Sequence, residues 1–225
     1  DYNHPSVVMY SIGNEITELG LATGQEQARI MTEFCHTQDH TRPVTAGINL
    51  MLATMAKSKK SIYGTDEDGN VKNSGTGGMD DAPTSEFFNI MMNKMGGLIN
   101  KAAKTKKATA IAEIMSDIFD IPGYNYASSR YKIDAKNHPE QATTGPETLP
   151  QTLYDNWQLV KSISTMTGDF MWTGYDYLGE SGIGTIQYKD KKTKQPADPG
   201  LIISGGAGII AVSYTHLRAH ETAAN

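Results

Sequence analysis

The sequence contains a single cysteine among its 225 residues, so it offers no disulfide framework of its own. It has no run of 18 apolar residues, and no membrane span is therefore predicted; nor does it open with a charged and then apolar signal segment. Basic side chains are in the minority, with 20 Lys and Arg against 25 Asp and Glu and a net charge of −5. This balance argues against nucleic acid or an anionic membrane as the main partner. The cysteine count fits a reducing compartment, and we expect a cytoplasmic location.

The remaining composition is typical of a globular protein. Hydrophobic residues make up 38% of the chain and charged residues 20%, with 22 Gly and 9 Pro. This length fits one domain or part of a larger one. The first residue is Asp1, and a strand-like run begins within the first ten residues. We therefore expect the chain to be a portion of a longer protein.

Short apolar runs alternate with helix-like segments along the chain. The run 6–12 (SVVMYSI) and the run 44–48 (VTAGI) have the length and β-branched content of buried parallel strands. Between them, 23–36 has apolar residues near helical spacing, with Thr23 as a candidate N-cap and Glu26 completing a capping box. Strand, helix and strand at this spacing form a βαβ unit.

The same alternation continues after a polar, Gly- and Asp-rich excursion over 58–84, which is typical of a surface loop. Helices are expected over 86–118 with a break near 96–97, over 127–135 and over 151–164. A strand with its exit loop is expected over 119–126, and further strands over 141–147 and 168–177. In the last of these helices, Leu153, Trp157, Val160 and Ile163 share one face. The pattern predicts an α/β protein with a parallel sheet.

Polar and aromatic residues gather where the expected strands end, which is where parallel α/β folds carry their active groups. Two carboxylates at the ends of different strands would suit glycosidic cleavage, which needs one acid and one nucleophile or base. A simpler interpretation is that these Glu and Asn side chains cap the helices that follow. The residues at the strand ends are Asn14, Glu15, Asn49, Asn125, Tyr126, Glu147, Trp172, Tyr175 and Asp176.

Three segments resemble signatures of glycoside hydrolase family 2, which contains β-galactosidases, β-glucuronidases and β-mannosidases. The segment 3–15 (NHPSVVMYSIGNE) resembles the surroundings of the acid/base glutamate, and 39–45 (DHTRPVT) resembles the approach to the fifth barrel strand. The segment 168–180 (GDFMWTGYDYLGE) resembles the eighth-strand region. The resemblance extends over about residues 1–210. It implies the carboxyl-terminal part of a (β/α)8 TIM barrel, strands four to eight, with the other half of the barrel and β-sandwich domains upstream.

Transferred residue by residue, the resemblance implies a retaining β-glycosidase, β-galactosidase-like, with a carbohydrate substrate. Glu15 would be the general acid/base, and its neighbour Asn14 would bind the sugar 2-hydroxyl. Glu147 falls where the seventh-strand nucleophile belongs, Tyr126 would orient that nucleophile, and Trp172 would form a platform for the sugar ring. No cofactor is implied, and no metal site is assigned.

The sequence departs from the family pattern near Glu147. Pro146 stands where relatives usually carry a small residue, and the insertion over 58–105 makes the spacing from Glu15 long. Other carboxylates could compete for the role of nucleophile. Glu113 lies in a helix-like segment that we expect to be solvated, Glu86 lies at an expected helix start, and Glu180 lies in the last loop.

Several further patterns favour ordinary structural roles. The cluster Cys35, His36, Asp39 and His40 lies at an expected helix end without zinc-site spacing. The acidic loop 66–70 lacks the terminal glutamate of a calcium loop, and the glycines over 205–208 lack the rest of a dinucleotide fingerprint.

The last fifteen residues, 211–225, resemble the translated read-through of a sequencing adapter, so we exclude them from the domain. His216 and His220 within them carry no weight as metal ligands. An alternative to an enzyme is a non-catalytic carbohydrate-binding barrel fragment. The sequence does not distinguish between galactose, glucuronate and mannose as the sugar.

Overall fold

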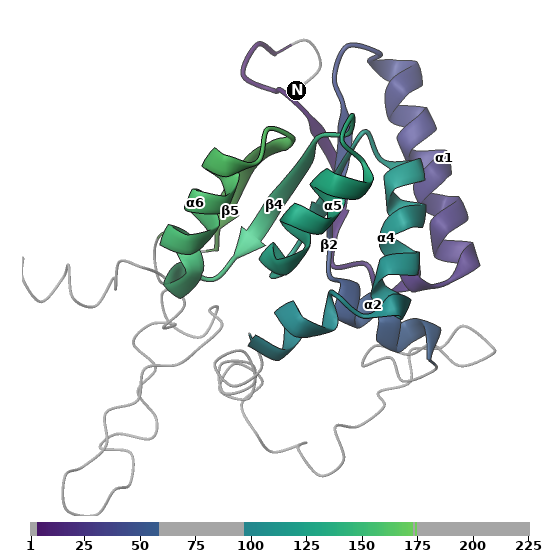
Figure 1. Ribbon diagram of the computed structural model, residues 1–225. Helices are drawn as coiled ribbons and strands as arrows, with labels where there is room; N and C mark the ends of the chain where they lie inside the picture. The colour runs from purple at the N-terminus through teal and green to yellow at the C-terminus, as the bar shows by residue number, and fades with distance from the viewer. Residues whose placement is uncertain (1–3, 59–96, 173, 175–225) are drawn as a thin grey trace, which may run out of the picture. The chain divides into compact units, whose positions relative to one another are not determined.

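The computed structural model describes residues 4–58, 97–172 and 174, and it contains one sheet of five strands in the order β1-β2-β3-β4-β5 (Figure 1). Neighbours in the sheet follow chain order, and the pairs β1–β2, β2–β3 and β3–β4 are parallel. Parallel strands added in chain order form the wall of a barrel, whereas a doubly wound sheet reverses its order. The strands are β1 Tyr10–Asn14, β2 Val44–Ile48, β3 Ile121–Tyr124, β4 Thr143–Thr148 and β5 Met166–Met171.

Each strand leads into helical structure before the next strand begins. Figure 1 shows α5 in front of the strands, with α6 on its left and α4 on its right beside α1. None of the helices in the described ranges is long and apolar enough to cross a bilayer. The helical elements are η1 Thr17–Gly20, α1 Ala22–Gln38, α2 Leu50–Lys57, a helical stretch over 97–102, α4 Lys106–Ile118, η2 Ser128–Arg130, α5 Tyr131–Asn137, η3 Pro150–Thr152 and α6 Leu153–Ser162.

The chain divides into two compact units. The first contains Asp1–Asp80 and Gly97–Phe170, and the second contains Asp81–Gly96 and Met171–Asn225. All the described helices and β1 to β4 belong to the first unit. Only Met171, Trp172 and Gly174 of the second unit are described.

The core of the first unit is built around β2, in which all five residues are buried. Val44, Ala46 and Ile48 are at most 1% exposed, and Ile111 and Met115 of α4 are completely buried in the same cluster. A strand that is covered on both faces has no exposed side, which explains why its sequence does not alternate between apolar and charged residues.

The strand expected over 6–12 is wrong at both ends, because β1 begins at Tyr10 and ends at Asn14. The guanidinium of Arg42 explains the late start. Its Nε donates to the carbonyl of Val7 at 2.6 Å and its Nη2 donates to the carbonyl of His4 at 3.0 Å, so these carbonyls are bound by a side chain and not by a neighbouring strand. The strand expected over 44–48 is confirmed to the residue.

Two other local expectations are wrong. Helix α1 has Leu21 as its N-cap with no side-chain cap, and Thr23 lies inside the first turn, because η1 leads into α1 through a single extended residue. In α6, the expected apolar face is not buried as a unit: Trp157 is 49% exposed, and the buried residue is Asn156. Asn156 Nδ2 donates to Thr152 at 3.1 Å and to Asp169 of β5 at 3.4 Å, so a polar side chain contributes to the docking of α6.

A buried ion pair holds the segment that follows β3. Arg130 is completely buried, binds the carboxylate of Asp134, and donates to the carbonyl of Ala103 and the hydroxyl of Thr109, each at 3.0 Å. Its guanidinium also lies 5.8 Å from the ring centre of Tyr124. A buried charge that lost its partner would be costly, so this network constrains the chain next to Tyr126.

Candidate active site

Hydrogen bonds between backbones continue past the ends of the strands and bring the strand-end residues together. The N–H of Glu15 donates to Gly47 at 2.7 Å, that of Asn125 donates to Ile48 at 2.9 Å, and that of Tyr126 donates to Glu147 at 2.9 Å. The carboxyl ends of β1 to β4 therefore form one continuous edge, and the polar side chains that follow them lie next to one another.

Irregular backbone turns two of these residues into the site. The register of β1 against β2 shifts between Ser11 and Asn14, as in a β-bulge, which twists a strand and redirects its side chains. Glu15, just after this shift, has a φ of 52°, and Tyr126 has a φ of 54°. A left-handed backbone is uncommon outside glycine and is often found at functional sites.

The carboxyl groups of Glu15 and Glu147 share one amide. Asn125 Nδ2 lies 3.2 Å from Glu15 Oε1 and 3.2 Å from Glu147 Oε2. These two oxygens are therefore at most about 6.4 Å apart, twice that distance, so the two carboxyl groups are close neighbours.

The surroundings of Glu15 favour its protonated form. Burial raises the pKa of this carboxyl, and the nearby charge of Glu147 raises it further. Hydrogen bonds from Asn49 Nδ2, at 2.9 Å, and from Asn125 Nδ2 oppose the effect in part, and the pKa remains above its ordinary value. A glutamic acid that keeps its proton can act as a general acid.

Glu147 has a different environment, rich in hydrogen-bond donors. The hydroxyl of Tyr126 donates to its Oε1, and the amides of Asn14 and Asn125 each donate to its Oε2 at 3.2 Å. These three donors hold the carboxyl group of Glu147 in one orientation. The site therefore holds one carboxyl that favours its proton and a second one surrounded by donors.

Asn49 combines a structural role with a place in the site. Its Oδ1 accepts from the N–H groups of Met51 and Leu52, at 3.1 and 3.2 Å, and so caps α2, while its Nδ2 donates to Glu15. The capping interpretation is thus correct for Asn49. It does not describe Glu15 or Glu147, whose carboxyl oxygens face amide and hydroxyl groups of other strands.

The proline before Glu147 is accommodated by a glycine on the neighbouring strand. A Cβ added to Gly123 would lie 2.9 Å from Cγ of Pro146 and 2.7 Å from the carbonyl oxygen of Ala46. Proline also cannot donate a backbone hydrogen bond inside a sheet. The glycine thus allows β4 to carry a proline directly before Glu147.

The other candidates fall elsewhere. Glu113 lies on α4 and pairs with His138 at 2.8 Å, outside the contacts described above. Trp172 belongs to the second unit. Six further sets of residues singled out in the sequence lie outside the described residues: Glu86, Glu180, Tyr175 with Asp176, and the segments 66–70, 205–208 and 211–225.

The cluster near the end of α1 is explained by local contacts. His36 pairs with Asp120 at 2.7 Å, and Asp39 pairs with Arg42 at 2.5 Å. Hydrogen bonds from the Thr41 hydroxyl and backbone hold the pKa of Asp39 well below its usual range. Within residues 4–58 and 97–172, no three His, Cys, Asp or Glu side chains converge as metal ligands would.

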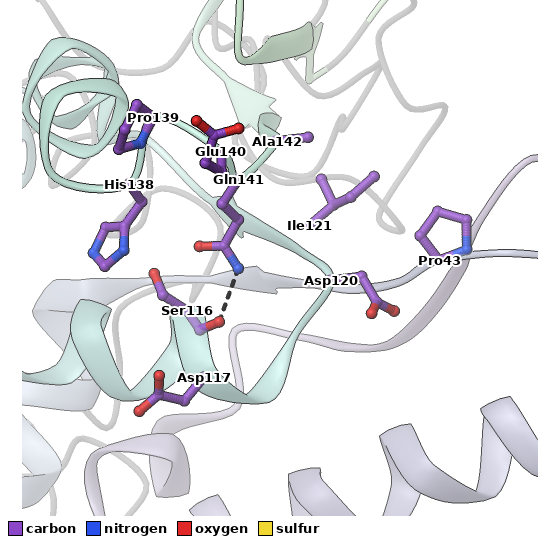
Figure 2. A pocket seen from close by; sticks show the side chains of 10 residues that line it. All are labelled: Pro43, Ser116, Asp117, Asp120, Ile121, His138, Pro139, Glu140, Gln141 and Ala142. Carbon is purple, nitrogen blue, oxygen red and sulfur yellow. Dashed lines mark hydrogen bonds between the residues drawn. The ribbon is translucent and has the colours of Figure 1, made fainter.

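A separate hollow lies at the opposite end of the strands (Figure 2). Pro43 and Ala142 precede β2 and β4, and Ile121 begins β3. Gln141 Nε2 donates across this hollow to the carbonyl of Ser116 at 2.8 Å, as the dashed line in Figure 2 marks. In barrel enzymes the active site lies at the carboxyl ends of the strands, so this hollow is distinct from the carboxylate site.

Comparison with known proteins decides the family. Residues 1–131, more than half of the chain, match the TIM barrel domain of glycosyl hydrolases family 2. The chain belongs to this family. The family resemblance and the partial TIM barrel expected from the sequence are confirmed, and the matched range includes Asn14, Glu15, Asn125 and Tyr126.

Two solved structures show the same relationship. A glycosyl hydrolase family 2 member from Bacteroides cellulosilyticus is 30% identical over 82% of this chain, with a TM-score of 0.51. Another, from Bacteroides cellulosilyticus DSM 14838, is 29% identical over 83% of this chain, with a TM-score of 0.50. The chain spans 16% and 18% of these two proteins. None of the curated proteins matches it.

Two site residues were not assigned roles from the sequence. Asn49 and Asn125 were recognised only as strand-end polar residues, and the structure brings both into contact with Glu15. Their positions at strand ends were the available signal. Their bonds to the carboxyl groups depend on side-chain directions that a strand boundary does not specify.

Proposed function

We propose that this chain is the barrel segment of a retaining β-glycosidase, in which Glu15 is the general acid/base and Glu147 is the nucleophile. The observation that carries the proposal is the pair of carboxyl groups bound to one amide at the carboxyl edge of the sheet. A retaining pair is separated by roughly 5–5.5 Å, which leaves room for the sugar but not for an intervening water. The full-length enzyme is the longer polypeptide that contains this sequence and completes the barrel.

In the first step, Glu147 attacks the anomeric carbon and Glu15 protonates the leaving glycosidic oxygen. The bond to the leaving group breaks, and an ester between the sugar and Glu147 forms. Burial of Glu15 supports its role as proton donor. Tyr126 supports the role of Glu147, because its hydroxyl donates to one carboxylate oxygen and so helps to orient the carboxylate.

In the second step, Glu15 has lost its proton and accepts one from a water molecule, which attacks the same anomeric carbon. The ester bond breaks, and the sugar leaves with its original β configuration. Besides substrate and water, both steps as written use only side chains of this chain.

The remaining residues are assigned to substrate binding. Asn14 lies beside Glu147, at 3.2 Å from its Oε2, where an amide would also reach the hydroxyl next to the anomeric carbon. Trp172 is proposed as the platform for the sugar ring. A terminal β-galactoside is the first substrate to test, followed by the β-glucuronide and the β-mannoside.

The test is to incubate the full-length enzyme with these three aryl β-glycosides and to follow the anomer released first by proton NMR. We expect the β anomer to form first and then to equilibrate with the α anomer. Initial release of the α anomer would contradict a retaining mechanism. Sugar binding without turnover of any glycoside would instead favour the non-catalytic, carbohydrate-binding alternative.

A further inference from the structure

We propose that Asn125 is a positioning residue that holds the two carboxyl groups of the site and transfers its hydrogen bond between them during the reaction. This inference rests on the proposed function and adds a residue to it. Asn125 follows β3, between the strands that carry Glu15 and Glu147, and is completely buried.

The amide nitrogen of Asn125 has more acceptors than hydrogens. Nδ2 lies 2.9 Å from Asn14 Oδ1 and 3.2 Å from an oxygen of each carboxyl group. An amide nitrogen has two hydrogens, so three acceptors compete for them. At any moment one of the three goes without a full hydrogen bond.

The direction of this amide follows from the charge around it. In the described part of the chain, Asn125 Oδ1 is buried without a hydrogen-bond partner, while Nδ2 faces the carboxyl groups. A rotated amide would place its oxygen against Asn14 Oδ1 and the carboxylate of Glu147, with repulsion at both. Burying Oδ1 without a partner costs free energy. The observed orientation of the amide is therefore expected only if the hydrogen bonds from Nδ2 to the carboxyl groups stabilise the protein by more than this cost.

The reaction moves negative charge from one carboxyl group to the other. Before the first step Glu147 is ionised and Glu15 is protonated, so the hydrogen of Asn125 is best used on Glu147. In the covalent intermediate Glu147 is a neutral ester and Glu15 is ionised, so Glu15 becomes the better acceptor. A donor equidistant from both oxygens can follow the charge with little movement.

The test is the pH profile of kcat/KM for the variant Asn125→Leu of the full-length enzyme. The acidic limb reports ionisation of the nucleophile and the basic limb reports loss of the proton from the acid. Loss of a donor to both carboxylates should raise both apparent pKa values by about one unit, because a hydrogen bond to a charged group changes its ionisation about tenfold. We also expect kcat to fall more than KM rises.

Two matched variants separate this role from general damage. Asn49→Ala removes a donor to Glu15, so only the apparent pKa of the basic limb should rise. Tyr126→Phe removes a donor to Glu147, so only the apparent pKa of the acidic limb should rise. If Asn125→Leu does not fold, Asn125→Asp is the variant to measure, because it keeps the shape of the side chain. Its negative charge should raise the apparent pKa values of both limbs further.

The outcomes distinguish the two proposals. Movement of both limbs supports the role of Asn125. A lower rate with both limbs unmoved, in an enzyme that Glu15→Ala and Glu147→Ala inactivate, overturns the role of Asn125 and leaves the proposed function standing. If those two alanine variants retain full turnover, the proposed function fails and the inference about Asn125 fails with it.

Discussion

Glu15 and Tyr126 follow different strands of the sheet, and both have a left-handed backbone, with φ of 52° and 54°. A side chain with a Cβ is disfavoured there by roughly 1–2 kcal/mol. The surrounding contacts, including the backbone bonds of Glu15 to Gly47 and of Tyr126 to Glu147, hold both residues in this conformation. The left-handed backbone at these two residues therefore costs stability and directs their side chains into the group around Glu147 and Asn125.

This strain gives a first prediction, on stability. Both Glu15→Ala and Glu15→Gly remove the carboxyl group, but only glycine adopts the left-handed backbone freely. We expect Glu15→Gly to be more stable than Glu15→Ala by about 1 kcal/mol, measured by denaturant unfolding of the full-length enzyme. The control is the same pair at Glu113 in α4, where the order should reverse because glycine costs about 1 kcal/mol in a helix. The same order at both positions would contradict the account of strain.

A second prediction concerns the roles of the two carboxyl groups. Glu147→Ala should abolish turnover, and Glu15→Ala should lower it by about 10²–10⁴-fold, the usual contribution of a general acid/base. Added azide should restore cleavage in Glu147→Ala with inverted product, because azide replaces the nucleophile and attacks from the opposite face to the leaving group. In Glu15→Ala azide should give retained product, because it replaces water in the second step. NMR of the glycosyl azides measures this, and identical stereochemistry from both variants would refute the assignment.

A third prediction concerns the backbone of the site. A Cβ added to Gly47 would lie 2.2 Å from Asn14 Oδ1 and 3.0 Å from Asn125 Oδ1, so both amides would have to move. Because a misplacement of about 1 Å can lower a rate on the order of 10²-fold, we expect Gly47→Ala to lower kcat/KM by about that factor. Gly97→Ala is the matched control, since its Cβ would meet nothing within 4 Å. Equal activity of the two variants in a steady-state assay would show that Gly47 does not set the site.

The sheet was predictable because its determinants are local. The run 44–48 (VTAGI) is short and β-branched and has no charged residue, and its strand was predicted to the residue because this composition suits a strand covered on both faces. The prediction for the run 6–12 was wrong because the carbonyl of Val7 is bound by Arg42, which lies 35 residues further along the chain. The start of α1 misled because η1 lies directly before it and removes the need for a side-chain cap.

The site was predictable at the level of which residues follow which strands. The motifs placed Asn14 and Glu15 at one strand end and Glu147 at another, and the structure brings the carboxyl groups of Glu15 and Glu147 to the same amide. The amide itself was not predicted. The bond of Asn125 to both carboxyl groups depends on the register across four strands, β1 to β4, and on the irregular step in β1, and neither is encoded in a short motif.

The most direct measurement for the central claim is to trap the covalent intermediate. A 2-deoxy-2-fluoro β-glycoside of the preferred sugar with a good leaving group should inactivate the full-length enzyme over time, since the fluorine slows both steps and the leaving group preserves the first. Peptide mass spectrometry should then find one sugar attached to Glu147 and none in the Glu147→Gln variant. A sugar on Glu15, Glu113 or another carboxylate, or turnover with no covalent adduct at all, would contradict the assignment of Glu147 as the nucleophile.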